Sequence, residues 1–112
     1  MGFRSETPSE LKWRERRRGV RMNSRVPIVV EWNTAEGAAE REEAITRIVS
    51  PHGCLVVFRH DLPLDQRLRV TNLDRQATAE ALVVWRGHER AEGHELGIEL
   101  VNPEIDFWGL EL

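Results

Sequence analysis

The sequence predicts an all-β fold, a six-stranded antiparallel barrel, from three observations. Six short runs of apolar or β-branched residues follow one another along the 112 residues, and several alternate apolar and polar side chains as half-buried strands do. Turn-forming residues separate the runs, and no segment with the period of an amphipathic helix lies between them. An open sheet of this size would expose two strand edges, so closure into one barrel with a single core is favoured.

The first three expected strands surround a long connection and a tight turn. Val26–Trp32 alternates apolar side chains with others and is the first strand. Asn33–Glu43 has no apolar stripe and is expected to be an exposed connection. Ala44–Ser50 and Gly53–Arg59 are apolar or β-branched runs, and the turn signal at Pro51 between them predicts two consecutive strands.

The last three expected strands also show a period of two. They are Arg67–Thr71, Ala77–Arg86 and Glu95–Val101. Gly87–Gly93 is expected to be the polar turn between the last two strands.

The two ends of the chain are expected to lie outside the barrel wall. Residues 1–13 are predicted to be a flexible leader, followed by a single domain over residues 14–112 that begins with a flexible basic arm. After Pro103 we expect a short C-terminal helical segment, in which Ile105 and Trp108 are three residues apart and pack on the end of the barrel.

Most of the positive charge lies in one short segment. Lys12–Arg25 holds seven basic residues and one acidic residue, a local charge of +6, whereas the rest of the chain holds nine basic and eighteen acidic residues, a charge of −9. A nucleic-acid-binding domain with a broad basic face has a different distribution, so specific nucleic-acid binding is not expected.

The arginines of this arm are the first candidate binding residues. Five arginines and a single acid lie within residues 14–21. Guanidinium groups bind phosphate oxygens through a bidentate fork and stack on flat rings, so the cluster suits a nucleotide better than a simple carboxylate. We therefore take Arg16, Arg17, Arg18 and Arg21 as candidate ligand contacts; the alternative is a solvated basic tail.

Two motifs in this chain resemble those of PilZ domains. That family of β-barrels has an RxxxR arginine pair ahead of the first strand and a DxSxxG or NxSxxG stretch between the second and third. Arg17 and Arg21 match the first motif. The second motif keeps Ser50 and Gly53 at the required spacing but has Ile48 where the family has Asp or Asn.

The resemblance implies a ligand, the bacterial second messenger cyclic di-GMP. Arg17 and Arg21 would bind its phosphates and the Hoogsteen edges of its guanines, whose N7 and O6 accept both donors of an arginine fork. Ser50 and Gly53 would shape the wall of the site on the barrel. The implied function is a cytoplasmic sensor or effector domain that couples nucleotide binding at the arm to an effector protein.

Ile48 opens an alternative to this function. Guanine N1 and N2 are hydrogen-bond donors, and isoleucine offers no acceptor, which costs about 1.5–3 kcal/mol of binding free energy. Strand alternation groups Ile48 with Thr46 and Ser50, opposite Val49, so we expect its side chain to face the ligand. The alternative is a degenerate PilZ domain that acts as a protein-binding adaptor without nucleotide.

Other classes of chemistry find little support in the sequence. His52 and Cys54 are two residues apart, but no set of four metal ligands has a recognisable spacing, so we expect no metal. Cys54 lies in an apolar run and is expected to be a buried thiol, and we expect no enzymatic activity and no cofactor. No apolar run is long enough to span a bilayer or serve as a secretory signal, which predicts a cytosolic protein without membrane insertion.

Overall fold

The computed structural model describes residues 22–110, and in this range the regular secondary structure is all β. The strands are β1 (Met22–Asn23), β2 (Pro27–Asn33), β3 (Ala39–Ser50), β4 (Gly53–Phe58), β5 (Arg67–Asn72), β6 (Ala77–Arg90) and β7 (Gly93–Val101). The six predicted strands correspond to β2 through β7, and β1 is an additional short strand. Residues 22–110 contain no helix with the length and apolarity that a membrane span requires.

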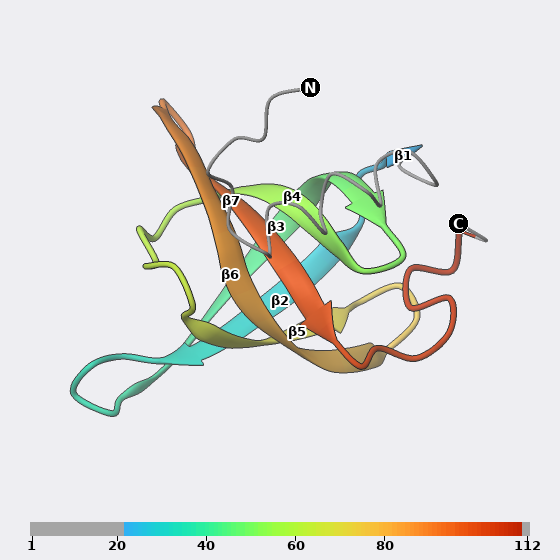
Figure 1. Cartoon of the computed structure of the whole chain (residues 1–112), viewed down its shortest axis with the longest axis horizontal. Coiled ribbons are helices and arrows are strands. Elements are labelled where there is room, and N and C mark those ends of the chain that lie inside the picture. Colours follow the sequence, from blue (N-terminus) through green and yellow to red (C-terminus); the bar gives the residue numbers. More distant parts are fainter. Residues whose placement is uncertain (1–21, 111–112) are drawn as a thin grey trace, which may run out of the picture.

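The sheet closes into the predicted barrel (Figure 1). All pairs are antiparallel, in the order β3-β2-β5-β6-β7-β4, and β3 also pairs with β4 to complete the ring. β2 pairs with the first half of β3, from Ala39 to Ile45, and β1 pairs with Ile48 and Val49 near its end. β1 and β2 therefore follow one another along β3, with Ser24–Val26 as the link between them.

Alternate side chains from every barrel strand fill the interior. Ile28 and Val30 of β2, Val70 of β5, Val83 of β6 and Ile98 of β7 are essentially inaccessible to solvent. Burying a side chain of this size stabilises the folded state by about 1.5–3 kcal/mol, so the period of two in the sequence reflects the main stabilising contribution.

Two connections are shorter than the sequence predicted. β3 begins at Ala39, so part of the expected connection Asn33–Glu43 is strand. β6 continues to Arg90, inside the expected turn Gly87–Gly93. Both hairpins carry exposed polar ends, and the β2–β3 hairpin visibly extends past the ring in Figure 1. Cross-strand backbone hydrogen bonds need no apolar face, which is why the polar composition concealed these strand ends.

The C-terminal segment is not the helical segment that the sequence predicted. Residues 105–110 form turns and bends, and Asp106 adopts a left-handed conformation, with φ of 59°, which interrupts a right-handed helix. Ile105 is 96% exposed, so its predicted packing on the barrel end is wrong. Trp108 is buried in the core cluster, as predicted.

Candidate functional site

The structure describes only some of the predicted site residues. Four of them lie outside the described residues 22–110, and their contacts stay a prediction: Arg16, Arg17, Arg18 and Arg21. The other three positions, Ile48, Ser50 and Gly53, lie in the β3–β4 hairpin, with Ser50 at the end of β3 and Gly53 at the start of β4.

A β-bulge in β3 determines which way Ile48 faces. Thr46 pairs with Val56, and Ile48 pairs with Leu55, the residue adjacent to Val56 in β4. Two steps along β3 therefore match one step along β4, so Arg47 is an extra residue in β3. Val56 belongs to the buried core, whereas Leu55 is half-buried and does not. Because directly paired residues share a face of the sheet, Thr46 faces the interior, and Ile48 and Leu55 lie on the outer surface of the barrel.

Because of the bulge, the predicted orientation of Thr46 is wrong. Simple alternation placed Thr46 on the same face as Ile48, but Thr46 is completely buried and Ile48 is half-buried on the opposite face. Val49, which belongs to the core cluster, faces inward as expected. The outward orientation of Ile48 is observed, and its contact with a ligand remains a prediction.

The buried hydroxyl of Thr46 fixes the link between β1 and β2. It accepts a hydrogen bond from the backbone N–H of Val26 at 2.8 Å and donates one to the carbonyl of Ser24 at 2.6 Å. The N–H of Ser24 in turn donates to the carbonyl of Arg47 at 3.2 Å. These bonds hold β1 beside the bulge, so that Asn23 is directly opposite Ile48.

Hydrogen bonds from three parts of the chain hold the β3–β4 turn. The Ser50 hydroxyl accepts from the N–H of His52 at 3.3 Å, and the Ser50 carbonyl accepts from the indole N–H of Trp108 at 2.8 Å. The N–H of Leu100 donates to the carbonyl of His52 at 2.7 Å. Ser50 is thus a buried turn residue, and Gly53 is buried and has no positive φ. Both residues fit a role in shaping the surface.

A line of outward-facing residues, which we call the outer row, crosses the barrel wall at the motif. Asn23 is opposite Ile48, Ile48 opposite Leu55, Leu55 opposite Gly97, and Gly97 opposite Trp85. A Cβ placed on Gly97 would lie 2.9 Å from the Cβ of Trp85, so the tryptophan lies against the glycine backbone. The outer row is polar at Asn23 and apolar elsewhere. Sequence reasoning did not single out Asn23, because its pairing across β3 cannot be read from one strand.

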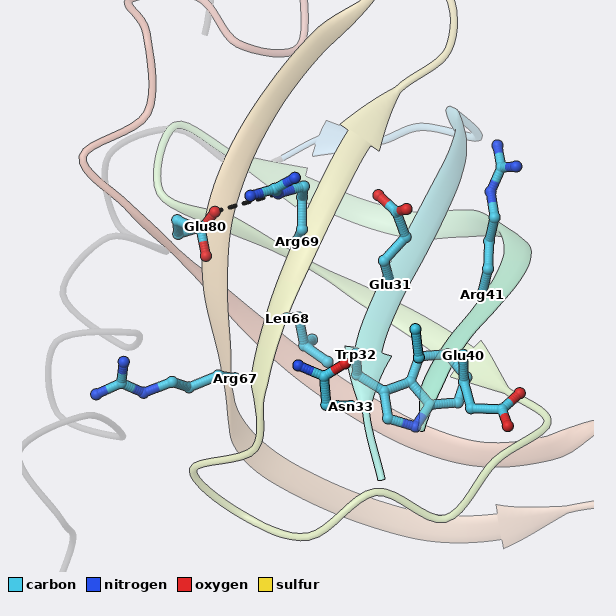
Figure 2. Close-up of a pocket in the computed structure, with 10 residues that line it drawn as sticks. Glu31, Trp32, Asn33, Glu40, Arg41, Arg67, Leu68, Arg69 and Glu80 are labelled. Atoms are coloured by element: carbon cyan, nitrogen blue, oxygen red, sulfur yellow. Dashed lines mark hydrogen bonds and ion pairs between the residues drawn. The ribbon is translucent and has the colours of Figure 1, made fainter. Parts of the chain in front are cut away.

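A separate pocket lies between β2, β3, β5 and β6 (Figure 2). Its wall includes three arginines and three glutamates, and Arg69 and Glu80 form an ion pair at 3.3 Å. Figure 2 shows the side chains of Arg41 and Arg67 extending away from the pocket. This balance of charge does not suit a ligand with two phosphates, and the pocket contains no residue of the two motifs.

Among the described residues, Cys54 and the possible metal ligands show neither a reactive thiol nor a metal centre. Cys54 is fully buried, as predicted, and burial raises the pKa of its thiol to about 12, which leaves it protonated at neutral pH. Within residues 22–110, no group of three or more His, Cys, Asp or Glu side chains could hold a metal ion.

Comparison with known proteins identifies the family. The family model described as PilZ domain matches residues 15–107, which include both motifs and all six strands of the barrel. A comparison with curated proteins gives no significant match. PilZ domains are binding domains, generally for cyclic di-GMP or as adaptors. With the match extending over most of its length and a closed six-stranded barrel, the chain belongs to the PilZ domain family.

Proposed function

We propose that this domain is a cyclic di-GMP sensor that binds the nucleotide between its arginine arm and the outer surface of the β3–β4 hairpin. The observation that carries the proposal is the position of β1. Met22 and Asn23 pair with Val49 and Ile48, so the chain that follows the RxxxR motif lies beside the second motif.

Covalent geometry limits how far the arginines can lie from this hairpin. Arg21 is bonded to Met22, so their Cα atoms are about 3.8 Å apart. Arg17 precedes Met22 by five residues, which keeps its Cα within about 18 Å even for a fully extended chain. Both guanidinium groups can therefore reach a ligand on the outer surface of β3 and β4.

The charge near the hairpin also favours an anionic ligand. Arg47 at the bulge and Arg25 in the link are exposed and add to the positive charge of the arm. An arginine fork can bind a phosphate or the N7 and O6 atoms of guanine. A ligand that carries both groups uses the whole cluster, whereas the rest of the chain is acidic.

The same geometry suggests how binding is signalled. A dianionic nucleotide neutralises the arm and holds it against the barrel, which changes the surface available to an effector protein. We infer a cytoplasmic domain whose partner binds the ligand-closed arrangement in preference to the open one.

Calorimetric titration of the whole chain with cyclic di-GMP tests the proposal. We expect saturable binding that weakens as salt is raised, because phosphate neutralisation is electrostatic. Arg17→Ala and Arg21→Ala should each weaken binding by about 2 kcal/mol, roughly 30-fold. Arg67→Ala is the matched control, since Arg67 is exposed on β5, which does not border the hairpin. Absence of binding by the folded wild type at millimolar nucleotide would refute the sensor function and leave the adaptor function.

A further inference from the structure

We propose that Asn23 supplies the hydrogen-bond acceptor for guanine that the second motif lacks at Ile48. This inference rests on the proposed function and extends it to a residue outside both motifs. The amide of Asn23 lies on the neighbouring strand, at the position directly across from the motif residue.

The strand register places the two side chains together. Asn23 pairs with Ile48, and directly opposed residues of antiparallel strands share a face, with Cβ atoms about 4.5–5.5 Å apart. Ile48 faces outward because of the bulge, so Asn23 also faces outward, and it is exposed. Adjacent strands are about 5 Å apart, so an acceptor at Asn23 is displaced by about one strand spacing from an acceptor at position 48. We infer that the edge of a bound guanine can be reached from either strand.

The position of Asn23 is fixed while its amide remains available. β1 is held to β3 by the hydrogen bonds of Ser24 and Thr46 described above, which makes the backbone at Asn23 part of the barrel wall. The side chain of Asn23 makes no hydrogen bond within the described residues 22–110. An exposed amide on a fixed strand is organised in advance for a ligand, because little conformational freedom is lost on binding.

The neighbouring side chains complement the amide. Guanine presents N1–H and N2–H donors along one edge and flat faces above and below the ring. The Oδ1 atom of Asn23 can accept from these donors. Leu55, beyond Ile48 in the outer row, offers an apolar surface for the face of the same base, and Ile48 lies beside the edge that Asn23 binds. In this arrangement isoleucine lies beside the base, and the hydrogen bond comes from the adjacent strand.

The test moves the amide between the two strands. In calorimetric titrations with cyclic di-GMP, Asn23→Ala should bind about tenfold more weakly than wild type, whereas Asn23→Asp, which keeps an acceptor, should stay within about threefold. The double variant Asn23→Ala/Ile48→Asn should recover affinity to within about threefold of wild type. Asn33→Ala removes an exposed asparagine at the end of β2 and is the matched control.

The outcomes separate a failure of this inference from a failure of the proposed function. If wild type binds and Asn23→Ala binds equally well, the role of Asn23 is wrong and the sensor function stands. If Asn23→Ala weakens binding but Ile48→Asn does not restore it, Asn23 acts on the structure of β1 and the inference is also overturned. If folded wild type does not bind cyclic di-GMP, both fail. Thermal melts of all variants confirm that each titration is made on folded protein.

Discussion

Replacing Ile48 with aspartate tests both the orientation of β3 and the ligand. Ile48 lies half-buried on the outer face, so Ile48→Asp removes the partial burial of an apolar side chain and places the new carboxylate where water can reach it. We expect a loss of about 1 kcal/mol in the free energy of unfolding. A carboxylate that accepts the guanine donors forms a charge-assisted hydrogen bond, worth about 1.5–3 kcal/mol. Because Asn23 already offers one acceptor nearby, we expect the lower end, about tenfold tighter binding.

Val49→Asp is the matched comparison for stability. Val49 is the next residue on β3, completely buried in the core. An unpaired carboxylate there costs several kcal/mol, a large part of the roughly 5–15 kcal/mol that stabilises a domain. The two variants therefore compare the same substitution at consecutive positions of β3, one facing outward and one facing inward.

The assay pairs thermal melts with calorimetric titration of cyclic di-GMP. Ile48→Asp should melt within a few degrees of wild type, and Val49→Asp should be largely unfolded. If Ile48→Asp unfolds as Val49→Asp does, the bulge does not direct Ile48 outward. If Ile48→Asp is folded but binds no more tightly than wild type, position 48 does not contact the guanine edge.

Three further predictions concern the groups that hold the site and the β6–β7 hairpin. Thr46→Val keeps the shape of the side chain but leaves buried backbone groups of the β1–β2 link unpaired, and should lower stability by about 2 kcal/mol in urea unfolding. Trp108→Phe removes the indole hydrogen bond to Ser50 and should cost about 1–2 kcal/mol in the same assay; an unchanged midpoint would show that this bond does not brace the turn. Burial by itself raises the pKa of Glu95, but hydrogen bonds from the Arg90 side chain and the His88 backbone outweigh it and lower the pKa. The stability that ionised Glu95 contributes is thus fully present above the pKa of an unfolded glutamate, roughly 4.3, and is lost as the pH falls through the lower pKa of the folded state. The melting temperatures of Glu95→Gln and wild type should therefore converge as the pH is lowered.

The sequence predicted the barrel because burial leaves a periodic signature in each strand. Ile28, Val30 and Val70 alternate with other side chains and face the core as expected. The signature is missing where strands leave the core. Glu40 and Arg41 pair with Trp32 and Glu31 in a hairpin that extends past the ring, and their polar side chains gave no reason to expect a strand.

The C-terminal segment shows that spacing alone does not define a helix. The interval between Ile105 and Trp108 fits a helical turn, but the backbone turns left-handed at Asp106. The N–H of Gly109 donates to the carbonyl of Asp106, and the N–H of Leu110 donates to its carboxylate, so a local turn satisfies these groups in place of a helix. Asp and Asn tolerate this conformation, a property that a pattern of apolar residues does not reveal.

The bulge at Arg47 explains why the site was predicted in part for the wrong reason. Alternation grouped Thr46 with Ile48, whereas the extra residue separates them onto opposite faces. Without the bulge, either Thr46 would lose its two hydrogen bonds to the β1–β2 link or Ile48 would point into the core. The bulge allows both: the threonine anchors β1 from inside the barrel, and position 48 stays on the outer surface beside Asn23. Because position 48 lies on the outer surface, it can carry either a polar or an apolar side chain without disturbing the core. An isoleucine there is therefore compatible with an intact barrel, and the proposed acceptor lies on the neighbouring strand at Asn23.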